Sequence, residues 1–279
     1  MSSYIKTALL FGILTVLLVL IGRAIGGTGG MTLFLIISLV INFASYFFSD
    51  KIALSMAHAQ AVSEQEAPQL YSIIRELTQK DNIPMPKIYI TPDMQPNAFA
   101  TGRNPKHASV AVTQGILKVL NVDQLKGVLA HEISHVKNRD ILIATIAAVL
   151  AGVITYVAQL GMFMGGGNNR ENSNPISGLL LIIVAPIAAT LIQLAISRQR
   201  EYAADLSGAE LTRKPEDLAT ALETIETNVQ RIPMQVNQSI SSLYIANPFG
   251  GRNLAGLFST HPSTADRIAR LMELEEKLK

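Results

Sequence analysis

Cysteine is absent from the 279 residues of this sequence. Disulfide bonds and thiolate metal sites are therefore excluded, and a metal ion would have to be bound by histidine and carboxylate side chains. A strong excess of charge is also lacking, because 23 basic and 21 acidic residues leave a net charge of +2. The sequence has no basic-aromatic or glycine-rich phosphate-loop pattern, so we expect no nucleic-acid partner.

Charged residues are scarce: they make up 16% of the chain, whereas 49% is hydrophobic. This composition is too apolar for an ordinary soluble domain and indicates a membrane protein with a soluble part. Long uncharged runs occupy residues 7–22, 31–48, 141–164 and 175–197. The first run is followed by a second apolar run and not by a small-residue cleavage site, which favours a transmembrane hairpin over a cleaved signal peptide.

The four runs divide the chain into four parts. We expect an N-terminal transmembrane hairpin at 1–50, a first catalytic part at 51–140, a second transmembrane hairpin at 141–197 and a second catalytic part at 198–279. The predicted fold class is a mainly α membrane protein, in which four transmembrane helices carry an α+β cytosolic domain with a small β-sheet.

Basic residues near the ends of the predicted spans are distributed unevenly. On one side of the membrane lie Lys6, Lys51, Lys137, Arg139, Arg198 and Arg200. On the other side lie Arg23 and Arg170. Since basic residues accumulate on the cytoplasmic side, both termini and the soluble domain are predicted to be cytoplasmic.

The segment VLAHEISHVKNRD at residues 128–140 carries the clearest chemical signal. His131 and His135 are four residues apart, so on a helix both imidazoles lie on one face and can bind one metal ion. Glu132 is rotated away from that face, where it can reach a metal-bound water without acting as a ligand. Asn121 and Gln124 form a plausible capping box at the start of this helix. The spacing predicts a metalloprotease site.

The third metal ligand has to come from elsewhere in the chain, since Asn138 and Ile141 occupy the positions of the Gly and His in the extended motif HExxHxxGxxH. His135 precedes the third apolar run by six residues, on the order of 9 Å along a helix. Glu201 follows the fourth run by four residues, roughly 6 Å. Antiparallel spans would therefore return Glu201 to the depth of the motif, whereas Glu171 would be on the opposite side.

Glu201 and Asp205 are again four residues apart on one helical face. We expect Glu201 to bind the metal and Asp205 to hold a ligand imidazole by its distal N–H. The reverse assignment, with Asp205 as ligand, is the main alternative. In a simpler interpretation, Arg198 and Arg200 pair with both carboxylates on an exposed helix, but that leaves the metal short of a ligand.

Local patterns predict the remaining elements of the soluble part. The apolar stripe Leu125, Leu129, Ile133 and Val136 should face the core. A strand is expected at 87–90, and a hairpin at 97–102 and 109–112 around the turn residues 104–105. Helices are expected at 68–79, 215–228 and 262–279, and a helical extension of the second span at 52–62.

The predicted hairpin segment has a second interpretation. Its first residues are Asn97, Ala98, Phe99 and Ala100. We expect them to form an edge strand that binds an extended substrate by β-addition, because main-chain pairing tolerates varied sequences. A plain hairpin without a binding role is the alternative.

His261 stands before Pro262 at the start of the last predicted helix. The functional hypothesis is that His261 stabilises the oxyanion or positions Glu132, with Arg267 as a helper. A surface capping position is the alternative interpretation.

The ordered set of two N-terminal spans, NAFATG, HEISHVKNRD, an inserted two-span hairpin, REYAAD and FSTHPS resembles the HtpX family of integral-membrane zinc metalloproteases. That family is related to type I CAAX prenyl proteases and to mitochondrial membrane-quality proteases. The resemblance implies that His131, His135 and Glu201 bind one zinc ion, with Glu132 as catalytic base. It also implies a gluzincin-type domain in a multi-pass protein of the bacterial inner membrane, which clears damaged or misfolded membrane proteins.

The predicted reaction is hydrolysis of peptide bonds, in which Glu132 takes a proton from water and passes it to the leaving amine. Polypeptides, mainly membrane proteins, and the lipid bilayer are the expected partners. A His/His/Glu ligand set favours zinc over other divalent ions. One rival is an intramembrane protease, which the polar residues 137–140 after the motif disfavour. Another rival is a metal-dependent chaperone, which would not need Glu132.

Overall fold

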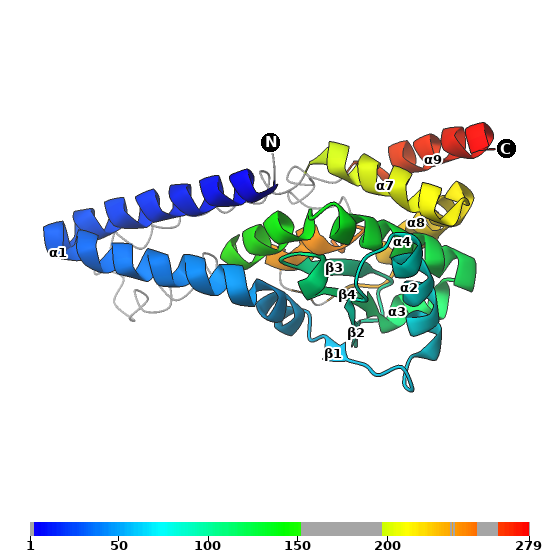
Figure 1. Ribbon diagram of the computed structural model, residues 1–279, viewed down its shortest axis with the longest axis horizontal. Helices are drawn as coiled ribbons and strands as arrows, with labels where there is room; N and C mark the ends of the chain where they lie inside the picture. The colour runs from blue at the N-terminus through cyan, green and yellow to red at the C-terminus, as the bar shows by residue number, and fades with distance from the viewer. Residues whose placement is uncertain (1–2, 152–196, 235, 237, 250–261, 279) are drawn as a thin grey trace.

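Two long apolar helices extend from one side of the molecule in the computed structural model of this chain (Figure 1). The structure describes residues 3–151, 197–234, 236, 238–249 and 262–278. The two helices together form α1 (Ser3–Met56), which is interrupted by non-helical backbone at Gly26 and Gly27. Gly27 has a φ of 58°, a conformation that glycine adopts without steric cost. The predicted N-terminal hairpin is therefore present, with its turn at these two glycines.

The surface of α1 is unusually apolar. Its segments Ile5–Arg23 and Gly26–Met56 are long and apolar enough to cross a membrane, and large side chains such as Phe43 are exposed. Water disfavours such a surface, whereas the hydrocarbon of a bilayer does not. Between the two helices, the amide of Asn42 donates a hydrogen bond of 2.9 Å to the hydroxyl of Thr15. Polar groups thus meet inside the hairpin and apolar groups cover its outside.

The predicted helical extension at 52–62 is confirmed as far as Met56 and is wrong for the residues after it. Helix α1 ends at Met56, and His58 adopts a left-handed φ of 51°. The following residues form β1 (Gln60–Ala61), which pairs with Tyr89 and Ile90 of the sheet. Pairing with the sheet uses the backbone groups that a continued helix would need for its own hydrogen bonds.

The sheet has four strands in the order β1-β2-β4-β3. Strand β2 (Lys87–Thr91) runs parallel to β4 (Ala108–Thr113), and β3 (Ala98–Gly102) runs antiparallel to β4. The side chain of Asn104 accepts hydrogen bonds from the first backbone groups of the 3-10 helix η1 (Pro105–His107), which closes the β3–β4 hairpin. The small sheet and its hairpin agree with the sequence prediction, and β3 lies at an edge.

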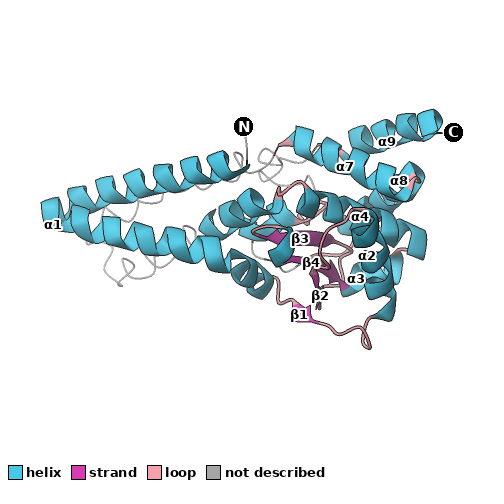
Figure 2. Cartoon of the chain, in the orientation of Figure 1, coloured by secondary structure: helices cyan, strands magenta, loops and turns pink. Residues whose placement is uncertain are grey.

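Helices cover the sheet, as Figure 2 shows. Their bounds are α2 (Pro68–Lys80), α3 (Gln114–Val119), α4 (Val122–Lys137), α7 (Arg198–Thr212), α8 (Pro215–Val229), the 3-10 helix η2 (Gln238–Leu243) and α9 (Thr264–Leu278). Helix α4 lies at the centre and packs against α2, α7, α8 and β3. Its predicted stripe Leu125, Leu129, Ile133 and Val136 is buried in the core.

The start of α4 is fixed by the predicted capping box. The side chain of Asn121 accepts from the backbone of Gln124, and the side chain of Gln124 accepts from the backbone of Asn121. A short apolar helix, Ile141–Ala151, follows α4. The remainder of the third apolar run and the whole span predicted at 175–197, except its last residue, lie outside the described residues.

Candidate metallopeptidase site

Helix α4 presents two imidazoles to one point in space. The Nε2 atoms of His131 and His135 are 3.2 Å apart, because residues four apart lie on the same side of a helix. Residue His131 is 1% exposed, so its ring is held by the surrounding protein. Two bare imidazole nitrogens at this distance need a proton or a cation between them.

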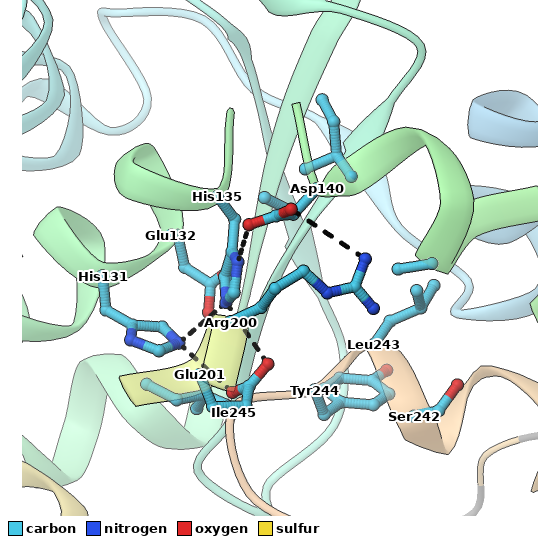
Figure 3. A pocket seen from close by; sticks show the side chains of 13 residues that line it. His131, Glu132, His135, Asp140, Arg200, Glu201, Ser242, Leu243, Tyr244 and Ile245 are labelled. Carbon is cyan, nitrogen blue, oxygen red and sulfur yellow. Dashed lines mark hydrogen bonds and ion pairs between the residues drawn. The ribbon is translucent and has the colours of Figure 1, made fainter. Parts of the chain in front are cut away.

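Helix α7 supplies a carboxylate to the same point. The Glu201 oxygens lie 3.8 Å from Nε2 of His131 and 3.6 Å from Nε2 of His135. This close approach of α7 to α4 depends on Gly208, at which a Cβ atom would lie 2.9 Å from the backbone nitrogen of His131. The distant pairing expected from the sequence is therefore present in the structure (Figure 3).

The far side of the His131 ring is tightly held. Asp205 Oδ1 lies 2.9 Å from Nδ1 of His131. Arg267 on α9 donates to both oxygens of Asp205 at 2.7 and 2.8 Å, and donates from Nη1 to the carbonyl of Ile245 at 2.9 Å. Because a carboxylate at Nδ1 fixes the N–H there, the lone pair of Nε2 faces Glu201.

The far side of the His135 ring is held more loosely. The backbone N–H of Asp140 donates to the carbonyl of His135 at 3.0 Å, and Arg139 adopts a φ of 59°. This turn brings Asp140 Oδ2 to 3.6 Å from Nδ1 of His135. The guanidinium of Arg200 lies 3.9 Å from the other oxygen of Asp140.

Burial and neighbouring charges shift the pKa values of this cluster. Burial lowers the pKa of His131 to about 4, although Asp205 opposes the shift. Burial alone would lower the pKa of His135, but the carboxylates of Glu201, Asp140 and Glu132 raise it to about 9. Burial would raise the pKa of the Asp205 carboxyl. The charge of Arg267 outweighs burial and lowers this pKa to about 2.

Glu132 lies beside the three converging groups and is 2% exposed. Burial raises its pKa to about 7, while the charge of His135 and the backbone N–H of Ala100 act in the opposite direction. A carboxylate with a pKa near neutrality can both accept and return a proton.

A pocket opens over these groups. It is lined by Ala100, His131, Glu132, His135, Asp140, Ile141, Ala144, Arg200, Glu201, Ser242, Leu243, Tyr244 and Ile245. Figure 3 shows their side chains around a common space. The pocket therefore joins the α4 motif, the start of α7, the edge strand β3, and the end of η2 with the two residues after it.

The donor atoms fit a metal ion. The relevant atoms of His131, His135 and Glu201 all lie within 4.8 Å of one another. A tetrahedral zinc ion with bonds of about 2.0–2.1 Å separates its ligand atoms by roughly 3.3 Å, close to the distances found here. Both oxygens of Asp205 are already hydrogen-bonded to Arg267, which favours Glu201 over Asp205 as the third ligand.

The four residues predicted to bind substrate, Asn97 to Ala100, differ in their contacts and in whether they line the pocket. The amide of Asn97 donates to the carbonyl of Ala246 at 2.8 Å, and the carbonyl of Ala98 accepts from the backbone of Ile245 at 3.0 Å. Phe99 is fully buried and packs edge-to-face on Tyr244. Of the four residues Asn97 to Ala100, only Ala100 lines the pocket.

His261, the predicted oxyanion residue, lies outside the described residues. Its predicted helper Arg267 is present and contacts Asp205. Three further parts of the pocket were not predicted to be site residues, namely Asp140, Arg200 and the segment 242–245. Two of these had a signal in the sequence, because Asp140 ends the motif HEISHVKNRD and Arg200 directly precedes Glu201.

An HExxH helix and a carboxylate from a second helix, which meet in a pocket beside an edge strand, define a metallopeptidase. The chain belongs to peptidase family M48, since the profile described as "Peptidase family M48" matches residues 64–275. Within that family it is a membrane metalloprotease of the HtpX type.

The relatives support this assignment over the whole chain. The "Protease HtpX homolog" of Pelotomaculum thermopropionicum is 52% identical over 273 residues, which cover 96% of this chain and 97% of that protein. The "Protease HtpX homolog" of Burkholderia thailandensis is 50% identical over 278 residues, with 98% of each chain covered.

A solved structure shares the fold. The crystal structure of S. mikatae Ste24p matches 93% of this chain with a TM-score of 0.50 and 19% identity. The match spans 62% of that longer chain. At this identity the similarity concerns the fold alone.

Proposed function

We propose that this metalloprotease holds one zinc ion per chain between His131, His135 and Glu201, and hydrolyses peptide bonds of misfolded or damaged membrane proteins and some cytosolic proteins. The observation that carries the proposal is the convergence of these three side chains within 4.8 Å, in a pocket that also contains Glu132. A His/His/Glu set with a neighbouring glutamate is the arrangement of zinc peptidases that act on a peptide carbonyl.

Glu132 acts as the general base in this proposal. Zinc held by His131, His135 and Glu201 would supply Lewis-acid chemistry, which activates water and polarises the scissile carbonyl. Glu132 accepts the proton of the attacking water and donates it to the leaving amine. Burial raises the pKa of Glu132 to about 7 in the metal-free site. The charge of a zinc ion would lower this pKa and favour the ionised carboxylate, which is the form that accepts a proton.

Asp205 and Arg267 fix the position of the His131 ring. Asp205 holds His131 at Nδ1, and Arg267 compensates the buried charge of Asp205. His261 is proposed to stabilise the oxyanion or to position Glu132. His261→Ala should lower the turnover number while zinc content stays unchanged, and wild-type turnover would rule this role out.

We place the substrate as an extended strand alongside β3. Odd-numbered residues of β3 bond to β4, as the hydrogen bond from Thr113 to Asn97 indicates, so the backbone groups of Ala98 and Ala100 face the open edge. The Ile245 backbone already occupies the carbonyl of Ala98. The substrate would therefore pair with the carbonyl of Ala100 and with the residues after it, next to Glu132, whose carboxylate the N–H of Ala100 faces.

This placement has a direct test. Ala100→Pro removes an outward N–H, which also faces the carboxylate of Glu132, and should abolish cleavage while zinc content stays at the wild-type level. Ala98→Pro also removes the N–H that bonds to the side chain of Asn97, so it serves as the structurally costlier comparison. Unchanged cleavage by Ala100→Pro would dispose of strand addition.

The site is proposed to lie at the cytosolic surface of the inner membrane. Helix α1 supplies two segments that are long and apolar enough to cross the bilayer. Basic residues at the proposed cytosolic ends of the spans support cytosolic termini. A further hairpin at 141–197 would complete four spans and link the two catalytic parts. Such a position gives access to cytosolic segments of membrane-protein substrates.

The function is tested with the full-length protein in lipid nanodiscs. Zinc content is measured for the wild type and for Glu132→Gln, and both are incubated with casein and with an unfolded membrane protein. We expect one zinc per chain in both proteins, and a loss of cleavage of at least about 100-fold in Glu132→Gln. A wild type that binds zinc without cleaving either substrate would instead support a metal-dependent scaffold.

A further inference from the structure

Arg200 lines the site pocket and carries a positive charge, but the proposed reaction gives it no role. It lies in the first turn of α7, directly before Glu201, and its side chain is 18% exposed. Figure 3 shows the guanidinium group in the same pocket as the metal-binding side chains. Its position beside a proposed ligand places it within reach of a bound substrate.

The Nη1 atom of Arg200 has almost no contact with solvent and has no hydrogen-bond partner among the described residues. Its nearest carboxylate oxygen, on Asp140, is 3.9 Å away, which is too long for a hydrogen bond. A buried N–H without a partner costs free energy, and such groups in native proteins call for an explanation. An acceptor brought by a ligand would supply the missing bond.

Arg267 shows what an arginine with a purely structural role looks like in this protein. Its Nε, Nη1 and Nη2 atoms all donate hydrogen bonds within the fold, at 2.8, 2.9 and 2.7 Å. The residue is 2% exposed and does not line the pocket. Arg200 differs on each point, because its Nη1 has no bond and its side chain borders the pocket.

The charges around Arg200 indicate which acceptor fits. Glu132, Asp140 and Glu201 all line the pocket with it, so three carboxylates face one another across a small space. A carboxylate on the substrate would add a further negative charge to this group. A neutral carbonyl oxygen accepts the same hydrogen bond without that repulsion.

We propose that Arg200 donates a hydrogen bond from Nη1 to a main-chain carbonyl oxygen of the bound peptide, beside the scissile bond. This inference rests on the proposed function of the site. Asp140 lies between Arg200 and Nδ1 of His135. Its charge orients the guanidinium, but it accepts no hydrogen bond from Nη1. Recognition of a backbone carbonyl is independent of side-chain sequence, which suits an enzyme that cleaves many polypeptides.

The test uses Arg200→Ala and Arg200→Lys in the full-length protein, with Arg198→Ala as the matched control. Arg198 is an exposed arginine in the same helical turn. We expect all three variants to keep one zinc per chain and the wild-type unfolding temperature. Arg200→Ala should lose about 10- to 100-fold in kcat/KM, as for one charge-assisted hydrogen bond. Arg200→Lys should lose less, and Arg198→Ala should lose nothing.

Two further measurements identify the acceptor. Guanidinium ion added to Arg200→Ala should restore part of the activity, and should not affect Glu132→Gln. In a series of peptides, each carbonyl oxygen near the scissile bond is replaced in turn by a thioamide sulfur. One replacement should slow the wild type and should not slow Arg200→Ala any further, because the bond is already missing.

The outcomes separate the two proposals. A wild type that shows no zinc-dependent cleavage removes the proposed function, and the assignment of Arg200 with it. A cleaving wild type with equal cleavage by Arg200→Ala overturns the Arg200 assignment alone. Loss of zinc in Arg200→Ala would show a structural role, and a loss confined to peptides with acidic side chains would show a side-chain carboxylate as acceptor. Either result overturns the carbonyl contact.

Discussion

The two imidazoles of the proposed zinc site are supported in opposite ways. His131 is backed by Asp205 at 2.9 Å, and Asp205 by both donor edges of Arg267 at 2.7 and 2.8 Å. His135 is backed by Asp140 at 3.6 Å, and Asp140 by Arg200 at 3.9 Å. Each side is a histidine–aspartate–arginine chain, but only the first is closed by hydrogen bonds.

Exposure follows the same division. The His131 and Arg267 side chains are 1% and 2% exposed, whereas those of His135 and Arg200 are 14% and 18% exposed. A saturated and buried chain fixes the position of a ligand, while an open chain leaves donors for a substrate. We infer that the His131 side keeps the metal in place and the His135 side faces the peptide.

Among changes on the His131 side, Asp205→Ala should have the largest effect on stability and zinc binding. This change leaves the buried guanidinium of Arg267 without a carboxylate, which should destabilise the fold by about 3–5 kcal/mol and abolish zinc binding. Chemical unfolding and metal analysis measure both effects. Glu223→Ala is the control, because Glu223 is an exposed residue in the middle of α8 and should change stability by less than about 0.5 kcal/mol. Equal effects of the two changes would contradict the proposed anchoring role.

A second prediction concerns the packing that supports the His131 side. A Cβ at Gly208 would approach the backbone of Ala130 and His131 to about 3 Å, so Gly208→Ala should move α7 away from α4. Overpacking of this kind costs about 1–3 kcal/mol, and zinc binding should weaken because Glu201 and Asp205 move with α7. Glu210→Ala, at an exposed position of α7, is the control. Wild-type zinc affinity in Gly208→Ala would show that the close approach is unimportant.

The smallest predicted effect is on zinc binding by the His135 side, the open side of the site. Asp140→Asn should weaken zinc binding by roughly tenfold, at the lower end of what distal partners of ligands contribute, since the contact with His135 is long. Asp205→Asn should weaken zinc binding by about 100-fold in the same chelator competition. Equal losses in the two variants would show that the two sides are equivalent and would remove the distinction drawn here.

Much of the site was predictable because its signals are local. The spacing of His131 and His135, together with the capping pair Asn121 and Gln124, defines helix α4 within a short stretch of sequence. The third converging side chain, the carboxylate Glu201, could be expected because the predicted membrane hairpin at 141–197 would return the chain to the same depth. These inferences needed no knowledge of how the domain packs.

The open side could not be predicted, since it depends on how α4, its following turn and α7 pack together. The alternative interpretation of the sequence paired Arg200 with Glu201 and Asp205, yet the nearest carboxylate oxygen of Arg200 belongs to Asp140. The left-handed turn at Arg139 that places Asp140 there has no glycine to mark it. The same holds for Tyr244 and Ile245, which reach the pocket through contacts with β3.

Two features of the sheet could not be predicted from the sequence for the same reason. Strand β1 is only two residues long and begins soon after an apolar helix ends, so no alternation of polar and apolar residues could reveal it. The edge of β3 was predicted from its hairpin, but its partial coverage by Ile245 was not. Both features are set by pairing between segments far apart in the chain, which local patterns do not record.

X-ray absorption at the zinc edge of the full-length protein, for the wild type and Glu201→Ala, tests whether His131, His135 and Glu201 bind one zinc ion. For the wild type we predict one zinc per chain with two imidazole nitrogens at about 2.0–2.1 Å and a carboxylate oxygen. Glu201→Ala should lose the bound zinc or retain it without the carboxylate signal. A zinc environment in Glu201→Ala identical to the wild type, or a wild-type site with a single imidazole, would contradict the account.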